Sequence, residues 1–198
     1  MIARRALPLI FATPAWAKAG GDYRWRVMRG GIAIGTHNIT FTERGGEHIA
    51  TSENLVTPRV MGVVVYRYEH RLVEVTRGGH FVSVRSSLNR NGTITEVEAE
   101  ASGQGVSLRG PAGRLNFPRE AAPLSWWQPQ RFGGGVPLFG TTTGQALDLR
   151  WTREALPGGI RWRTDGEIEA VLEFDAGGRW TAYQVKGDDG STVIYAPA

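Results

Sequence analysis

The four histidines are the side chains with which this chain could bind a metal ion; they are His37, His48, His70 and His80. Zinc ligands recur at short, regular spacings, and the intervals between these histidines do not match them. The sequence contains no cysteine, which removes thiolate ligands, thiol catalysis and disulfide bonds. We therefore predict no metal site, and no motif indicates a cofactor.

Acid–base chemistry would first be sought at Glu69, His70 and Glu74, which lie in one strongly alternating segment. Successive side chains of a strand point to opposite faces, so only His70 and Glu74 could share a site. The chain has no G-x-S-x-G nucleophile motif, H-E-x-x-H motif, phosphate loop or dinucleotide fingerprint. We therefore assign no catalytic residue.

Two other acidic patterns have simpler explanations than catalysis. Glu96, Glu98 and Glu100 alternate strictly, and three like charges on one strand face indicate solvent. The acidic run at Asp188 and Asp189, followed by Gly190 and Ser191, resembles part of a calcium loop but lacks its later acidic ligand. A β-turn explains this run better.

Aromatic residues are the stronger functional signal. Many lie in alternating segments, where they either fill the interior of a barrel or line a pocket for an apolar ligand. In the pocket interpretation, Tyr68 and His70 supply the few polar contacts. The candidate ligand-binding residues are Tyr66, Tyr68, His70, Trp126, Trp127, Trp151 and Trp162.

Period-two alternation recurs from residue 23 to residue 195, and no stretch shows a helical stripe. The segment 63–76 is long and strongly patterned, with Tyr68, His70 and Leu72 on one face. Paired glycines, Asn91-Gly92 and Asp165-Gly166 supply hairpin turns between the strands. We predict an all-β fold: an antiparallel meander of about a dozen strands, curved into a barrel or half-barrel, because no crossover helix could build a parallel sheet.

One long irregular stretch, residues 118–143, interrupts this pattern. It holds four prolines, the pair Trp126-Trp127 and a run of three glycines, and Ser125 could cap at most a brief helical turn. A loop of this length in a compact domain is usually functional. It could equally be a packed cover over one open end of the sheet.

The first nineteen residues have the layout of a secretory signal peptide. Arg4 and Arg5 precede an apolar run of about ten residues, and two small-x-small cleavage sites follow. The run is too short to span a bilayer of ~30 Å, so we expect no membrane span in the mature form. The sequence thus predicts a signal peptide at 1–19, a single β-barrel-like domain at 20–198, and export to the periplasm.

Removing these residues changes the charge. The full chain has 23 Lys plus Arg against 19 Asp plus Glu, and cleavage takes away Arg4, Arg5 and Lys18. The remainder is close to neutral, which removes the electrostatic motive for a nucleic-acid partner.

A family resemblance rests on three stretches. They are the G-x-x-I-G opening at residues 31–35, the segment 66–74 and the closing segment 189–195. Together they resemble an uncharacterised family of exported bacterial β-proteins, a domain of unknown function. More distantly, the predicted architecture is similar to the half-barrels of periplasmic lipoprotein and lipid carriers, although the covering helices of those proteins are missing here.

Three functions remain open. The leading one is an exported binding or carrier protein that holds an apolar or lipid-like molecule in its β-concavity. The second is an envelope assembly module that contacts another protein through edge strands or the long loop. The third is an isomerase or hydrolase on a β-barrel.

Overall fold

The computed structural model describes residues 21–187 and 189–198, so the predicted signal peptide lies outside the described residues. The described chain is almost entirely β-structure, and no helix in it is long and apolar enough to cross a membrane. The strands of its first part are β1 (Tyr23–Arg29), β2 (Ile32–Arg44), β3 (Glu47–Val56), β4 (Arg59–Val60), β5 (Val63–Val64), β6 (Tyr68–Arg77), β7 (His80–Arg90), β8 (Thr93–Ser102), β9 (Gly105–Gly110) and β10 (Gly113–Phe117).

The second part begins with an irregular segment and returns to long strands. The irregular segment contains the short strands β11 (Ala122–Pro123) and β12 (Leu138–Phe139), and between them the 3-10 helix η1 (Pro129–Arg131). The long strands are β13 (Leu149–Leu156), β14 (Gly159–Gly166), β15 (Ala170–Asp175), β16 (Trp180–Lys186) and β17 (Thr192–Pro197).

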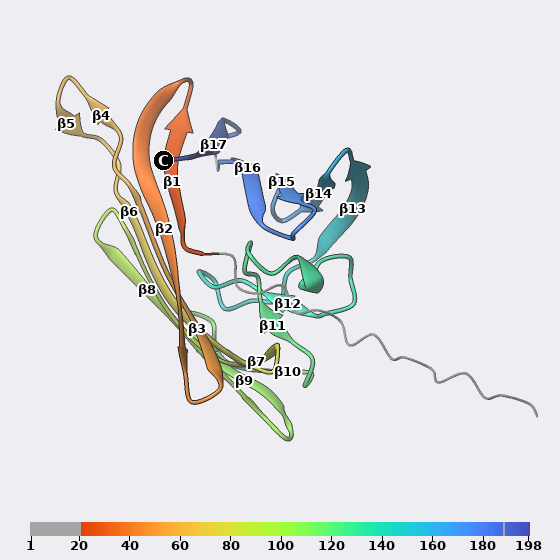
Figure 1. Ribbon diagram of the computed structural model, residues 1–198. Coiled ribbons are helices and arrows are strands. Elements are labelled where there is room, and N and C mark those ends of the chain that lie inside the picture. The colour runs from red at the N-terminus through yellow and green to blue at the C-terminus, as the bar shows by residue number, and fades with distance from the viewer. Residues whose placement is uncertain (1–20, 188) are drawn as a thin grey trace, which may run out of the picture.

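Thirteen of these strands form one antiparallel sheet in the order β10-β9-β8-β7-β6-β3-β2-β1-β17-β16-β15-β14-β13. Local hairpins build two halves of this sheet, which we call its wings: one runs from β10 to β1 and the other from β17 to β13. The pairing of β1 with β17 joins the wings, with Val27 opposite Tyr195. Figure 1 shows the sheet curving around the irregular segment. The predicted all-β meander is confirmed, and it is an open half-barrel whose edges are β10 and β13.

The predicted long strand over 63–76 is wrong in its first part. The chain leaves the sheet after Val56, because Pro58 has no N–H for the ladder, and β4 and β5 form a separate hairpin. Its turn is made by Met61 and Gly62, both with positive φ. The main sheet resumes at Tyr68, so Tyr66 lies in the link between β5 and β6.

The two glycines of the G-x-x-I-G opening have different structural roles. Gly31 has a φ of 79° in the turn between β1 and β2. Gly35 lies so close to β3 that a Cβ atom there would meet the carbonyl oxygen of Leu55 at 2.0 Å. A bulge between β1 and β2 shifts the alternation, so that Ile34 packs against the core and Ala33 is exposed.

Buried side chains lie on one face of the sheet, which we call the inner face. They form two clusters, one around β1 and β15–β17 that includes Trp25 and Leu172, and one around β6–β9 that includes Val84 and Leu108. The segment 118–148 packs against both clusters, with Leu138 in the first and Phe139 in the second. This segment therefore covers the inner face of the half-barrel.

Candidate functional site

The covering segment is fastened to the sheet by a buried polar cluster. The Arg131 guanidinium lies 2.6 Å from the Glu74 carboxylate on β6, and both side chains are buried. Ser125 Oγ donates a hydrogen bond to the second oxygen of Glu74. Arg131 Nη1 also donates to the carbonyl oxygen of Pro123 at 3.0 Å, which ties the segment to itself. Ser125 is thus a partner of Glu74, and the predicted helix cap at this residue is wrong, because the 3-10 helix starts four residues later.

Aromatic rings of the covering segment and of β13–β14 form one contiguous group. Phe132 stacks on Trp151 with ring centroids 4.3 Å apart, and Trp151 meets Trp162 edge to face at 6.0 Å. Trp126 lies 6.4 Å from Phe132 and 5.2 Å from Tyr183 of β16. This aromatic group is half-buried at the tryptophans, so part of it faces the rim of the half-barrel.

An apolar pocket of about 280 Å³ lies at this rim. Ile160, Trp162 and Phe174 form its sheet wall, and Pro129 of the covering segment forms the opposite side. The turns at Gly158 and at 175–178 complete its mouth. We call it the rim pocket; its volume is near the lower end of the range for small-molecule sites.

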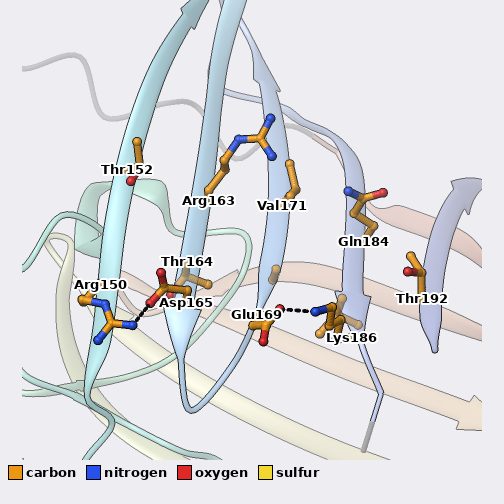
Figure 2. Close-up of a pocket in the computed structure, with 12 residues that line it drawn as sticks. Arg150, Thr152, Arg163, Thr164, Asp165, Glu169, Val171, Gln184, Lys186 and Thr192 are labelled. Atoms are coloured by element: carbon orange, nitrogen blue, oxygen red, sulfur yellow. Dashed lines mark ion pairs between the residues drawn. The ribbon is translucent and has the colours of Figure 1, made fainter. Parts of the chain in front are cut away.

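A second pocket, of about 330 Å³, lies on the opposite, outer face of β13–β17 (Figure 2). Charged side chains dominate it, and they largely neutralise one another: Arg150 pairs with Asp165, and Lys186 Nζ lies 2.6 Å from Glu169. Arg163 stands between them, above Val171 and Gln184, and reaches Glu154 at 3.9 Å. The side chains of these two ion pairs are more than half exposed, so each pair adds little to the stability of the fold. A ligand would meet no buried charge here.

Two histidine–serine pairs lie on the inner face of the neighbouring strands β2, β3, β6 and β7. His37 Nε2 is 2.8 Å from Ser52 Oγ, and His70 Nε2 is 2.8 Å from Ser86 Oγ. Burial lowers the pKa of His37 to about 3, with a smaller contribution from His70. Burial likewise lowers the pKa of His70 to about 4.

Each pair combines a serine hydroxyl with an imidazole, the residue types of a nucleophile and its general base, but the imidazoles are too weakly basic for that role. A general base works best with a pKa near the operating pH, and imidazoles with pKa values of about 3 and 4 hold a proton too weakly for that. Nδ1 of His37 has no hydrogen-bond partner among the described residues, so no carboxylate orients its ring. Glu74, which shares the inner face as predicted, is committed to Arg131.

The remaining polar groups of this region are uncharged as well. Asn54 Nδ2 donates to Tyr195 OH at 3.1 Å, and burial raises the pKa of Tyr195. Burial also raises the pKa of Tyr183, whose ring centroid lies 4.6 Å from that of Tyr195. The inner face of these strands thus carries three neutral hydrogen-bonded pairs, of which Asn54–Tyr195 links β3 to β17 across β2 and β1.

The predicted ligand-binding residues fall into three places. Trp126, Trp127, Trp151 and Trp162 pack against the first core cluster, and Trp162 lines the rim pocket. Tyr68 and His70 lie together on β6, with rings 6.2 Å apart, and His70 pairs with Ser86 of β7. Tyr66 is half-buried in the link before β6. The structure therefore brings the four tryptophans together and separates them from the two tyrosines and His70.

Of the residues that line the rim pocket, sequence reasoning named Trp162 and missed the other apolar walls, Ile160, Phe174 and Pro129. Ile160 and Phe174 could have been found, because the alternation of β14 and β15 places them on the same face as Trp162 and Leu172. Pro129 comes from an irregular segment whose path has no periodic signal.

The other sequence candidates have surface or turn roles. His48 and His80 are exposed, and His48 Nδ1 lies 3.1 Å from Glu43. No group of three metal-binding side chains occurs among the described residues. Asp189 accepts hydrogen bonds from both the backbone and the hydroxyl of Ser191, as a turn requires.

Comparisons with known proteins give a family and a fold. A family model described as a domain of unknown function (DUF6134) matches residues 25–198, which confirms the resemblance to an uncharacterised family. A search of curated proteins gives no match.

Two solved structures are similar in shape. The β-barrel-like protein of domain of unknown function DUF1849 from Brucella abortus has a TM-score of 0.60 at 6% identity, over 89% of this chain and 94% of that one. A DUF1089 family protein from Pseudomonas aeruginosa has a TM-score of 0.46 at 12% identity, over 91% of this chain and 96% of that one. The first supports the β-barrel-like fold alone.

Proposed function

The chain belongs to the family described as a domain of unknown function (DUF6134), and we propose that it is a binding or carrier protein for an apolar or lipid-like molecule. The ligand lies in the rim pocket, with its apolar part against Trp162 and Phe174. We propose the periplasm as its place of action, since residues 1–19 have the layout of an export signal.

The observation that carries this proposal is the character of the rim pocket. Its sheet wall consists of Ile160, Trp162 and Phe174, and the described lining includes a single charged residue, Asp175, at the mouth. Each apolar contact removes surface from water, and aromatic walls offer large contact areas at little entropic cost. A volume of about 280 Å³ suits a small apolar molecule or one end of an acyl chain.

The covering segment forms the side of the pocket that faces the sheet wall. Pro129 and Gly133 approach the sheet at Trp162, where a Cβ on Gly133 would lie 3.4 Å from the indole ring. The stretch that contains them is held farther in by the Glu74–Arg131 ion pair.

The other two functions have weaker support. Strand addition would use one of the two edge strands, and of these β13 carries the charges of Arg150, Arg153 and Glu154, as edges that avoid pairing do. Hydrolysis would need a stronger base than His37 or His70.

Binding can be tested with the uncharged fluorophore N-phenyl-1-naphthylamine. Ala176→Trp fills the mouth of the rim pocket from an exposed turn, and Ala112→Trp makes the same change in an exposed turn of the other wing. We expect saturable fluorescence enhancement for the wild type and Ala112→Trp, and an affinity at least about tenfold lower for Ala176→Trp, which is about 1.4 kcal/mol. No saturable binding, or equal binding by all three proteins, would refute the proposal.

A further inference from the structure

Exposed large apolar side chains are concentrated on the β4–β5 hairpin and the residue that follows it. Val60 is 59% exposed, Met61 100%, Val63 66% and Val65 56%. Leu55 nearby is also exposed, so five of the nine exposed large apolar residues fall within eleven positions. Such a concentration on one projecting element marks a contact surface, whereas scattered exposed residues are ordinary.

The hairpin stands apart from the main sheet. β4 and β5 pair only with each other among the described strands, through Arg59 with Val64 and Val60 with Val63. Figure 1 shows it projecting beyond the end of β6, beside the turn between β1 and β2. Ile32, which follows that turn, and Ile94, which follows the turn between β7 and β8, are exposed at the same end.

The charge of the segment is one-sided. Residues 55–67 contain two arginines and no aspartate or glutamate. Arg59 Nη1 donates to the carbonyl oxygen of Gly62, which holds a positive charge beside the turn at the tip. The nearest acidic residues along the strands, Glu53 and Glu69, pair with Arg71 and Arg67.

We propose that the β4–β5 hairpin docks this protein onto an anionic lipid bilayer. An apolar tip with a basic group beside it is the arrangement of interfacial membrane anchors, whose aliphatic side chains enter the acyl boundary and whose basic groups meet the headgroups. Met61 at the apex is unbranched and adapts to a fluid surface. Tyr66, half-buried below the tip, lies where aromatic side chains favour the interface.

A bilayer fits the hairpin better than a second copy of the chain. A symmetric partner would have to bring the Arg59 guanidinium groups of two hairpins together, and residues 55–67 of neither copy contain an acidic side chain to pair with them. The tip also ends in a point at Met61 rather than a flat face, and a deformable surface can surround it.

The absence of cysteine from the sequence allows a local test. Met61→Cys in the full chain is labelled with the environment-sensitive dye NBD, and Val73→Cys, exposed on the outer face of β6, is the control. Vesicles contain phosphatidylcholine with or without phosphatidylglycerol. Because both variants carry the same N-terminus, a difference between the two dyes reports the hairpin itself.

We expect the dye at residue 61 to shift to the blue and brighten several-fold on phosphatidylglycerol vesicles, with quenching by spin-labelled acyl chains. The dye at residue 73 should not change, and Val60→Ser with Val63→Ser should reduce the response at residue 61 several-fold. Equal responses at both positions, or no response at residue 61, would overturn the proposal. A response without vesicles that grows with protein concentration would also overturn it, in favour of a second copy.

Discussion

Glu74 in the middle of β6 and Arg131 at the end of η1 form an ion pair of 2.6 Å in which both side chains are buried. The pair joins the sheet to the segment that covers its inner face. Neither residue reaches solvent, so each charge depends on the other, on Ser125 and on the carbonyl of Pro123. The inner face of the open half-barrel is therefore covered at this point by the segment 118–148 of the same chain.

Removing Arg131 should be strongly destabilising. Arg131→Ala leaves the Glu74 carboxylate buried without its counter-charge, and such losses cost about 3–5 kcal/mol of the free energy of unfolding. Urea denaturation followed by tryptophan fluorescence measures this cost. The double variant Glu74→Leu with Arg131→Met should recover most of the loss, because it leaves no buried charge. A loss below about 1 kcal/mol for Arg131→Ala would contradict the burial of the pair.

Acid should destabilise the fold through His37 and His70. Their pKa values in the folded protein are about 3 and about 4, below the ordinary value of 6.5, so the unfolded chain binds more protons between pH 6.5 and these values. The stability that neutral burial provides is thus complete above pH 6.5 and declines as the pH falls. At pH 5 the linkage amounts to about 2 kcal/mol for each histidine.

The pH dependence can be assigned with histidine variants. We expect the urea midpoint to fall from pH 7.5 to pH 5, and to fall less in His37→Gln or His70→Gln. The exposed His48 and His80 provide matched controls, whose Gln variants should keep the full dependence. A midpoint that is constant over this range would show that the two imidazoles are not buried as described.

Gly35 should tolerate no side chain. A Cβ atom there would meet the Leu55 carbonyl oxygen at 2.0 Å, and that oxygen belongs to the backbone of β3 and cannot turn away. We expect Gly35→Ala to lower the free energy of unfolding by about 1–3 kcal/mol, the usual cost of overpacking. Gly103→Ala, at a position with open space around it, should change stability little. Thermal melts that rank the two variants equally would contradict the close approach of β2 and β3.

The fold was predictable from the sequence wherever its cause is local. Paired glycines and Asn91-Gly92 indicate hairpins, and both residues of the pairs at 30–31, 45–46, 78–79 and 91–92 have positive φ in the structure. Alternation also assigned Glu96, Glu98 and Glu100 correctly to solvent. Both signals arise from steric and solvation effects within a few residues.

Features that depend on distant segments were not predictable. The pairing of Val27 with Tyr195 joins the two ends of the described chain, and no local pattern specifies which strands close such a gap. Glu74 could be placed on the inner face from its position in β6, but its partner Arg131 lies in a segment without periodicity. For the same reason, the sequence indicated Trp162 on the sheet wall of the rim pocket but not Pro129 on its opposite side.

Native mass spectrometry tests the binding of an apolar ligand most directly. The protein, stripped of bound molecules under denaturing conditions and refolded, is mixed with a set of single-chain lipids and compared with its Ala176→Trp and Ala112→Trp variants. We predict a 1:1 lipid adduct for the wild type and Ala112→Trp that is largely lost in Ala176→Trp, because only that change fills the rim pocket. The absence of an adduct from the refolded wild type, or adducts of equal abundance in all three proteins, would contradict an apolar binding site at Trp162 and Phe174.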